Sequence, residues 1–372
     1  MEYLMGTLGL LLLIPLVWPF VAKAIWSHEI TLPQMGINLG VGVLVVLAGY
    51  YGSRYAQGYD IEIHNGRLTS KTSEHVSCEH SYSCNCREIC TGSGKDRSCS
   101  TTCDTCYEHS YDVDWKLKTE VGDIKVSRVD RRGIFEPPRF SRAQPGDPVS
   151  VAKSYQNYIK AAPDSLFSKA TEQTLKAQFE GRLPAYPDDV HDLHYVNRVI
   201  VQGVPVPDVA RWNSDLQELL ATLGPKKQVN AVLVMTNEVN PNFAEALRAA
   251  WLGGKKNDVV VVLGMPQYPE IAWTRVFSWT DRELFKVELR DDLQELHTLD
   301  RAAVMATLRK HIERDFVRKS MKDFAYLQNE VEPPLWLVVL LALGSLGVSV
   351  GVSMYFARNS GHYYRQNHRY RR

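Results

Sequence analysis

The sequence has no excess of charge of either sign: 43 Lys and Arg residues stand against 42 Asp and Glu residues, a formal net charge of +1. A chain without bulk basicity is not typical of nucleic-acid-binding proteins, so we expect no nucleic-acid partner. The sequence also lacks a His-Glu-x2-His motif, a phosphate-binding loop, a Gly-x-Ser-x-Gly motif and a dinucleotide-binding fingerprint. These absences leave no common catalytic motif from which an enzyme can be identified.

Long hydrophobic runs are confined to the two ends of the chain, and the charged residues lie between them. Residues 3–22, 32–51 and 335–356 each have about the 20 mostly apolar residues that a bilayer-spanning helix needs. We therefore predict an integral membrane protein with two transmembrane helices in residues 1–51 and one in residues 334–357. The lipid bilayer is thus an expected partner.

The first hydrophobic segment has a second interpretation, as a cleaved signal peptide. Ala22-Lys23-Ala24 resembles a small-x-small cleavage site. The residues before the segment include Glu2 and no Lys or Arg, whereas a signal peptide normally begins with positive charge. The membrane helix is therefore the favoured interpretation.

The C-terminal residues set the expected orientation. Residues 358–372 contain five Arg and no acidic residue, which predicts a basic tail in the cytoplasm. The third helix then places the region between the membrane segments outside the cytoplasm. The second helix returns the short loop around Lys23 to the cytoplasm, in agreement with its charge.

Residues 52–150 are expected to form a β-rich module. Alternating or β-branched runs occur at residues 59–64, 110–117 and 123–129. Asn65-Gly66, between two such runs, predicts a hairpin turn. Residues 151–204 are expected to connect this module to the next one.

Residues 205–333 are expected to form an α/β module. The runs NAVLVMT (230–236) and DVVVVLG (258–264) are typical of strands buried on both faces, and residues 270–279 suggest a third strand. Helical patterns cover residues 208–223, 242–252 and 300–329. Strands that alternate with helices predict a mainly parallel sheet covered on both faces.

The order of these elements resembles the TPM domain family over residues 205–330. The pieces are DVARWNSDLQELLATLG and VNAVLVMT, then NFAEALRAAWLGGKKNDVVVVLG, IAWTRVFSW and FVRKSMKDFAYL. The resemblance implies a Rossmann-like fold held outside the cytoplasm, and a role as an accessory subunit or in the repair of membrane complexes. In some family members it also implies metal binding or phosphatase activity. Asp258 matches an acidic position tied to that chemistry, whereas Phe277-Ser278-Trp279 replaces the family's glycine-rich acidic stretch.

All seven cysteines lie within 29 residues, which indicates a cross-link that holds a loop-rich segment together. Zinc is one interpretation, because these cysteines and one histidine supply the eight ligands of two tetrahedral sites. Three disulfides and a free thiol are the second, favoured by an oxidising compartment. A redox or iron–sulfur role is the third. The candidate ligands are Cys78, Cys84, Cys86, Cys90, Cys99, Cys103, Cys106 and His109.

The predicted fold class is therefore a membrane-anchored α+β protein, with three transmembrane helices, a Cys-rich β module and a Rossmann-like α/β module. The predicted function is a non-enzymatic interaction or accessory protein with a protein partner in or near the membrane. The main alternative is a membrane-bound phosphatase with Asp258 as its cofactor-binding residue. A virus-encoded envelope protein is a third interpretation.

Overall fold

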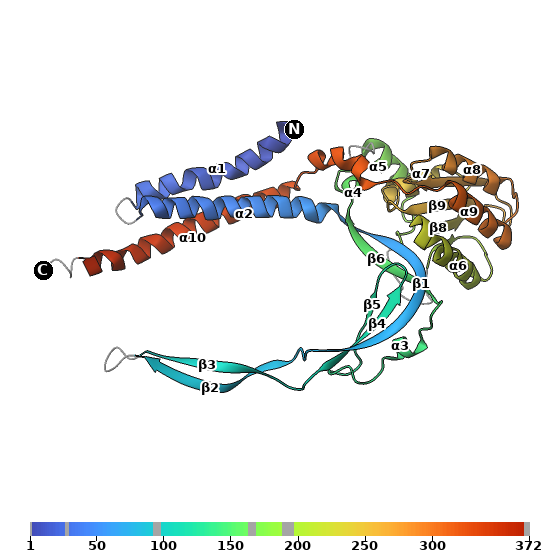
Figure 1. Ribbon diagram of the computed structural model, residues 1–372. Helices are drawn as coiled ribbons and strands as arrows, with labels where there is room; N and C mark the ends of the chain where they lie inside the picture. The colour runs from blue at the N-terminus through green and yellow to red at the C-terminus, as the bar shows by residue number, and fades with distance from the viewer. Residues whose placement is uncertain (1, 27–29, 92–97, 163–168, 188–196, 368–372) are drawn as a thin grey trace.

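The computed structural model describes residues 2–26, 30–91, 98–162, 169–187 and 197–367. A bundle of long helices lies at one end and a mixed α/β unit at the other (Figure 1). A curved β arch lies beside the α/β unit and ends in a long two-stranded hairpin. The chain is therefore a mixed α+β protein, as the sequence predicts.

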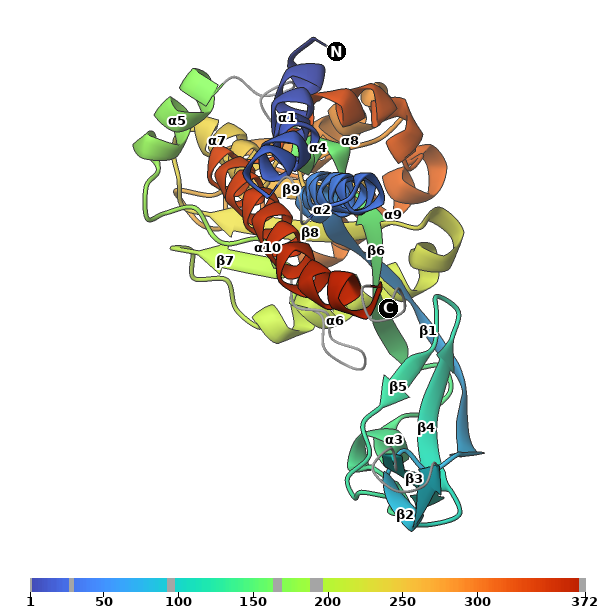
Figure 2. The same ribbon diagram turned by 90° about the vertical axis from the view of Figure 1, so that its left-hand side faces the viewer.

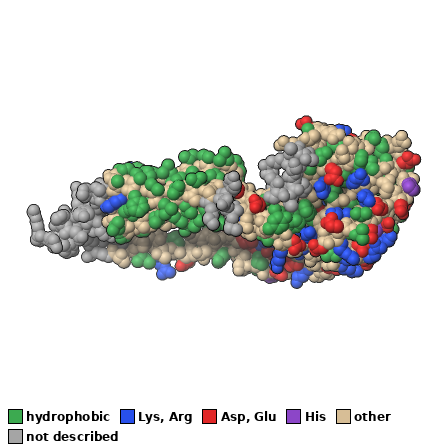
Figure 3. All heavy atoms as spheres, turned by 90° about the horizontal axis from the view of Figure 1, so that it is seen from above, with side chains coloured by type: hydrophobic (Ala, Val, Ile, Leu, Met, Phe, Trp, Pro, Cys, Tyr) green, Lys and Arg blue, Asp and Glu red, His purple; other side chains and the backbone are tan. Residues whose placement is uncertain are grey.

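Three helices in the described residues are long and apolar enough to span a membrane. They are α1 (Glu2–Ile25), α2 (Leu32–Gly58) and α10 (Leu335–Asn367), with apolar spans at Gly6–Ile25, Leu32–Gly58 and Leu335–Asn359. Hydrophobic side chains cover the bundle, whereas charged side chains gather on the α/β unit (Figure 3). The predicted basic tail continues α10 as helix up to Asn367, and residues 368–372 lie outside the described residues.

A buried polar seam joins the three helices. Asn38 on α2 donates from Nδ2 to Ser349 O at 3.0 Å and to Ser353 Oγ at 2.6 Å on α10. Trp18 Nε1 on α1 donates to the same Ser353 hydroxyl at 3.1 Å. Small and polar side chains let helices approach closely in lipid, where apolar side chains alone do not favour association. This seam fixes which faces of the helices meet.

The β arch is built on one long strand that continues directly from α2, because β1 begins at the residue after α2. The first half of β1 pairs antiparallel with β6 and the second half with β4, giving the sheet order β5-β4-β1-β6. Leu68, Leu117, Ile124 and Phe140 are central to its core. The elements are β1 (Tyr59–Val76), β4 (Asp112–Thr119), β5 (Ile124–Val126), α3 (Pro138–Arg142) and β6 (Pro148–Gln156).

The predicted turn at Asn65-Gly66 is wrong, because β1 runs through both residues without a break. Gly66 pairs with Val149 of β6 instead of turning the chain. A Cβ atom at Gly66 would lie 3.0 Å from a methyl of Val121, so a larger residue here would fit only if Val121 moved by a few tenths of an ångström. A Cβ at Gly224 would lie 2.1 Å from Asn65 O, which shows how tightly the α/β unit packs on the arch.

The hairpin of β2 (Ser81–Thr91) and β3 (Ser98–Tyr107) is called here the disulfide hairpin. It extends from the far end of the arch in the same direction as the long apolar helices of the bundle (Figure 1). Figure 2, viewed along the bundle, shows the hairpin set apart from the helices. Its described side chains are mostly exposed, and none of them belongs to a hydrophobic cluster of the described chain.

The α/β unit contains a four-stranded sheet of order β10-β9-β8-β7. β7, β8 and β9 are parallel, and β10 is antiparallel to β9. The strands are β7 (Val199–Gln202), β8 (Asn230–Thr236), β9 (Asp258–Gly264) and β10 (Trp273–Ser278). The helices are α5 (Lys169–Gln178), α6 (Val209–Lys227), α7 (Asn242–Ala250), α8 (Glu283–Gln294) and α9 (Arg301–Asp315).

Both faces of this sheet are buried, as uninterrupted apolar strands predict. Leu233 and Val261 point into a core shared with α6, α8 and α9. Val232 and Val260 point into the opposite core, shared with α7 and with Phe179, which follows α5. The result is a three-layer arrangement with helices on each side of the sheet.

The single long helix predicted over residues 300–329 is wrong. α9 ends at Asp315, where Phe316 turns extended and is fully buried. A bridge between Thr280 and Arg318 follows, and then the 3-10 helix η3 (Met321–Glu330). Phe324 and Leu327 of η3 pack on Ile159 of α4 (Tyr158–Ala161), a few residues before α10 begins.

Candidate functional site

Asp258, the candidate cofactor-binding residue, is the first residue of β9 and has no exposed surface. Asn230 Nδ2 donates to its Oδ1 at 2.8 Å. The Tyr186 hydroxyl donates to Oδ2 at 2.7 Å, and the backbone N–H of Lys255 donates to the same oxygen at 2.8 Å. Protein donors therefore contact both carboxylate oxygens. Among the described residues, Asp258 belongs to no group of three or more side chains that could hold a metal ion.

The position of Asp258 in the sheet also does not favour a ligand site. Open α/β sheets bind ligands at the carboxyl ends of their parallel strands, whereas Asp258 stands at the amino end of β9. The β arch covers this end, since Asn257 Nδ2 donates to Ile63 O at 2.7 Å. Burial raises the pKa of Asp258, and the hydrogen bonds from Asn230 and Tyr186 oppose that rise. The geometry fits a structural role for Asp258, where the β arch meets the α/β unit.

Buried ion pairs continue this junction. Lys255 Nζ contacts Asp60 Oδ1 at 2.5 Å, and Glu62 contacts Arg318 and, at 3.7 Å, Lys256. Burial raises the pKa of Glu62, but hydrogen bonds from His64 and Arg318 and the charge of Lys256 outweigh it and lower the pKa to about 2. Acids on β1 thus meet cations of the α/β unit, and removal of either partner would leave a buried charge.

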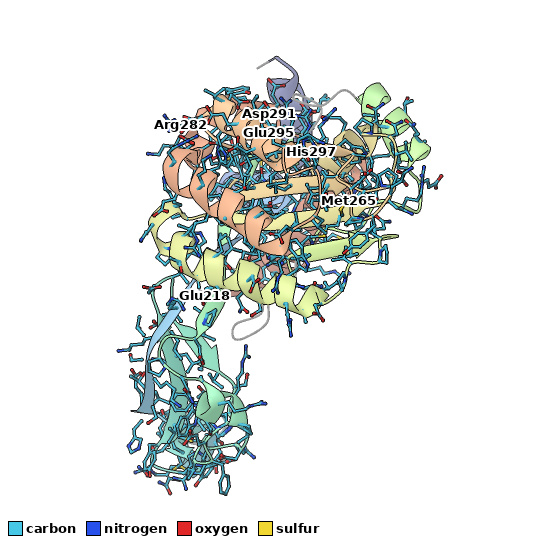
Figure 4. The ribbon with its side chains drawn as sticks, turned by 90° about the vertical axis from the view of Figure 1, so that its right-hand side faces the viewer. Glu218, Met265, Arg282, Asp291, Glu295 and His297 are labelled. Atoms are coloured by element: carbon cyan, nitrogen blue, oxygen red, sulfur yellow. A yellow bond between two sulfur atoms is a disulfide. The ribbon has the colours of Figure 1, made fainter. Side chains whose placement is uncertain are left out.

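An exposed ion pair marks the outer edge of the same junction. Arg67 of β1 contacts Glu218 of α6, which Figure 4 labels on the helix next to the arch. The Arg67 guanidinium also donates to Thr222 Oγ1 at 3.2 Å. The arch therefore contacts the α/β unit along a continuous line of polar groups, and sequence reasoning missed this role of the alternating acids on β1.

A pocket beside β10 is lined by several cations but has no free nucleophile among its lining residues. Ser278 donates its hydroxyl to Asp258 O at 2.5 Å, and Thr280 donates its hydroxyl to Val317 O at 2.9 Å. The two acids that line the pocket form ion pairs with neighbouring cations. The lining side chains include Glu245, Arg248, Arg275, Glu283, Lys286 and Lys319.

A cluster of acidic residues around His311 connects α8 and α9. His311 is buried and contacts Asp292 at 2.7 Å, and its other ring nitrogen lies 3.8 Å from Asp315. Asp315 also pairs with Arg282 at 3.1 Å, and Glu288 pairs with Arg314 at 2.7 Å. Figure 4 shows Arg282 and Asp291 on this side of the unit. Cations pair with these acids, and the contacts join α8 to α9.

Six of the candidate metal-binding cysteines form disulfides. The bridges are Cys84–Cys106, Cys86–Cys103 and Cys90–Cys99, and each joins β2 to β3. The structure thus has the three disulfides and one free cysteine of the second interpretation. A disulfide sulfur carries no thiolate and so does not serve as a zinc ligand, which leaves the predicted pair of four-ligand zinc sites without most of its ligands. Disulfides suggest an oxidising, extracytoplasmic compartment.

The remaining candidates, Cys78 and His109, lie together. Ligand atoms of Cys78, His109 and Asp112 lie within 4.8 Å of one another. Hydrogen bonds from the backbone of Glu79 and from His109, together with the charge of Arg128, hold the pKa of Asp112 below its ordinary value despite burial. Sequence reasoning missed Asp112, although its position three residues after His109 was a usable signal.

Comparison with models of protein families, with curated proteins and with solved structures finds no match to this chain.

Proposed function

We propose that this chain is a non-enzymatic interaction or accessory protein that is anchored in a membrane and presents the disulfide hairpin to a protein partner outside the cytoplasm. The likeness of residues 205–330 to the TPM domain family belongs to this proposal. It is supported by the order of helices and strands, and by a three-layer unit that is followed directly by a membrane helix.

The observation that carries the proposal is the cross-linking of an element whose side chains join no hydrophobic cluster of the described chain. A two-stranded hairpin is marginally stable alone, so three disulfides hold it in shape. Its side chains add nothing to the hydrophobic clusters of the described chain. Rigid elements that protrude from a fold and bury nothing inside it are suited to contact another molecule.

The exposed surface of the hairpin supports a protein partner. The hairpin extends toward the side of the molecule that holds the bundle (Figure 1). It exposes Tyr82, Ile89 and Tyr107, each with more than half of its surface free, among polar side chains. Aromatic residues with a polar surround are typical of protein interfaces, whereas the polar side chains do not suit acyl chains.

The phosphatase alternative has less support. Asp258 is enclosed by three hydrogen-bond donors, and both hydroxyls beside β10 donate to backbone carbonyls. We expect no turnover of aryl phosphates above background. Robust turnover that disappears in Asp258→Asn would overturn the non-enzymatic proposal in favour of the phosphatase.

The proposed orientation places the hairpin outside and the C-terminus in the cytoplasm. Reporter domains test it, one fused after Arg372 and one inserted at Gly146, which lies in an exposed turn. The first should behave as cytoplasmic and the second as external. Both reporters on one side would contradict the orientation.

The interaction itself is tested by photo-crosslinking in intact cells. A photoreactive residue at Tyr82 or at Ile89 should yield one discrete crosslinked product. The matched control is Val239, which is 74% exposed and lies on the α/β unit. Products at Val239 and none at the two hairpin positions would contradict the proposal that the hairpin is the contacting element.

A further inference from the structure

The cluster of Cys78, His109 and Asp112 lies where the disulfide hairpin joins the arch. Cys78 lies between β1 and β2, and His109 lies between β3 and β4. The pairing of β1 with β4 ends at Val76 and Asp112. Cys78 and His109 therefore lie on the two segments that connect the arch to the hairpin, and Asp112 follows as the first residue of β4.

The cluster is enclosed on one side and open on the other. Cys78 is 5% exposed, and the Asp112 side chain has no exposed surface. Cys78 Sγ accepts a hydrogen bond from His80 N at 3.4 Å and donates one to His80 O at 3.4 Å, so two backbone contacts fix the position of the sulfur. Ser77, Tyr107 and Ser110 line the opening that leads to Cys78 and His109.

Asp112 is held so that one oxygen faces the cluster. Arg128 Nη1 donates to its Oδ2 at 2.9 Å, and Glu79 N donates to the same oxygen at 3.0 Å. The other oxygen, Oδ1, contacts His109 Nε2. Hydrogen bonds to Oδ2 therefore fix the carboxylate, while Oδ1 shares a hydrogen with the imidazole of His109.

We propose that Cys78, His109 and Asp112 form a binding site for one zinc ion. Thiolate, imidazole and carboxylate are the three ligand types that zinc takes in proteins, and the fourth position would be filled by water from the opening. The ion takes the place of the hydrogen between Asp112 Oδ1 and His109 Nε2. Binding releases the thiol proton of Cys78. The hydrogen displaced from His109 Nε2 moves to Nδ1 of the same ring, so His109 stays neutral and one proton is released in all.

The charges at the joint fit this occupant. One thiolate and one carboxylate balance the two charges of the ion, and Arg128 keeps its contacts with Asp112 Oδ2 and with Asp114 Oδ1, the latter at 2.5 Å. The ligands come from the chain before β2 and from the chain after β3. The ion would therefore fix the direction in which the hairpin leaves the arch. The site is independent of the six disulfide cysteines.

The test uses the full chain in detergent micelles, without reductant, so that the disulfides stay intact. Dialysis against zinc should load one ion per chain, and Co²⁺ as the probe should give a thiolate-to-metal absorption band. Cys78→Ser and His109→Gln should each weaken binding at least tenfold. His75→Ala is the matched control, because His75 stacks on Tyr111 with ring centroids 4.2 Å apart, and it should bind as the unmodified chain does.

Alkylation of Cys78 gives a second readout. Zinc should slow alkylation in the unmodified chain but not in His109→Gln. Each variant should keep a mass six units below the all-thiol value for its three disulfides. The proposal is overturned if the unmodified chain gives no cobalt–thiolate band and zinc leaves its alkylation rate unchanged. It is also overturned if Cys78→Ser binds zinc as tightly as the unmodified chain, because the ion then lies elsewhere.

Discussion

Removal of one disulfide should loosen the disulfide hairpin and leave the rest of the protein unchanged. The sharpest perturbation replaces the inner bridge by Cys90→Ser with Cys99→Ser. The paired change leaves no new free thiol that could exchange with the other bridges. Because β2 and β3 bury no side chain in a hydrophobic cluster of the described chain, the hairpin should open as a local unit.

The magnitude follows from the length of chain that the bridge closes. Cys90 and Cys99 are 9 residues apart, and in the chain-entropy model a loop of that length corresponds to about 2.6 kcal/mol. This figure is an upper value, because the bridges of separation 17 and 22 enclose the inner one and already restrict the chain. The opening equilibrium of the hairpin should therefore rise by up to about 80-fold.

Hydrogen exchange followed by mass spectrometry on the full chain measures this equilibrium. Amides of β2 and β3 should exchange faster in the paired variant, while those of the buried strand β8 should exchange as before. An equal rise in β8 would show that the hairpin belongs to the cooperative unit of the α/β sheet. No rise in β2 and β3 would show that the bridge does not hold the hairpin closed.

Four further predictions follow from the core, the junction and the bundle. Val261→Asp places an unpaired charge in the middle of β9 and should lower the free energy of unfolding by about 3–5 kcal/mol, whereas exposed Val239→Asp should change it little in the same denaturant titration. Asp258→Asn sets an amide among three donors and should cost about 1–3 kcal/mol. The folded-state pKa of Glu62 is about 2, below its ordinary value of 4.5. The ionised carboxylate therefore stabilises the folded state above pH 4.5, and this stabilisation is lost as the pH falls toward 2. The difference in the free energy of unfolding between the unmodified chain and a Glu62→Gln variant should shrink over that range. Asn38→Ala removes the α2–α10 hydrogen bonds and should weaken helix association by about 1 kcal/mol in a micelle unfolding assay.

Elements with a strong local pattern could be predicted from the sequence. The strands at Asn230–Thr236 and Asp258–Gly264 have the predicted bounds, because runs that are apolar on both faces fit little else. The three long apolar helices could be predicted for the same reason, since their length and composition alone identify them. The helix predicted over residues 300–329 was wrong because its local pattern does not reveal the extended turn at Phe316.

Features that depend on long-range contacts could not be predicted. Asn65-Gly66 has the composition of a turn, but pairing with Ser150 and Val149 of β6 keeps both residues within β1. The choice between zinc and disulfides depends on the register of β2 against β3, which places Cys90 directly opposite Cys99. Cysteine spacing alone does not contain that register. The enclosure of Asp258 depends likewise on Tyr186, which is far away in the sequence.

The most direct test of the account is to remove the disulfide hairpin and ask whether the protein still joins a larger assembly. Ser81 and Tyr107 are paired across the hairpin, so an Asn-Gly turn can replace residues 82–106 without displacing the arch. This variant keeps Cys78 and His109. Native gel electrophoresis of mild detergent extracts should show the unmodified chain in a complex and the variant at the size of the free protein. Equal mobility of the two within the same large complex would contradict the proposal that the hairpin contacts the partner.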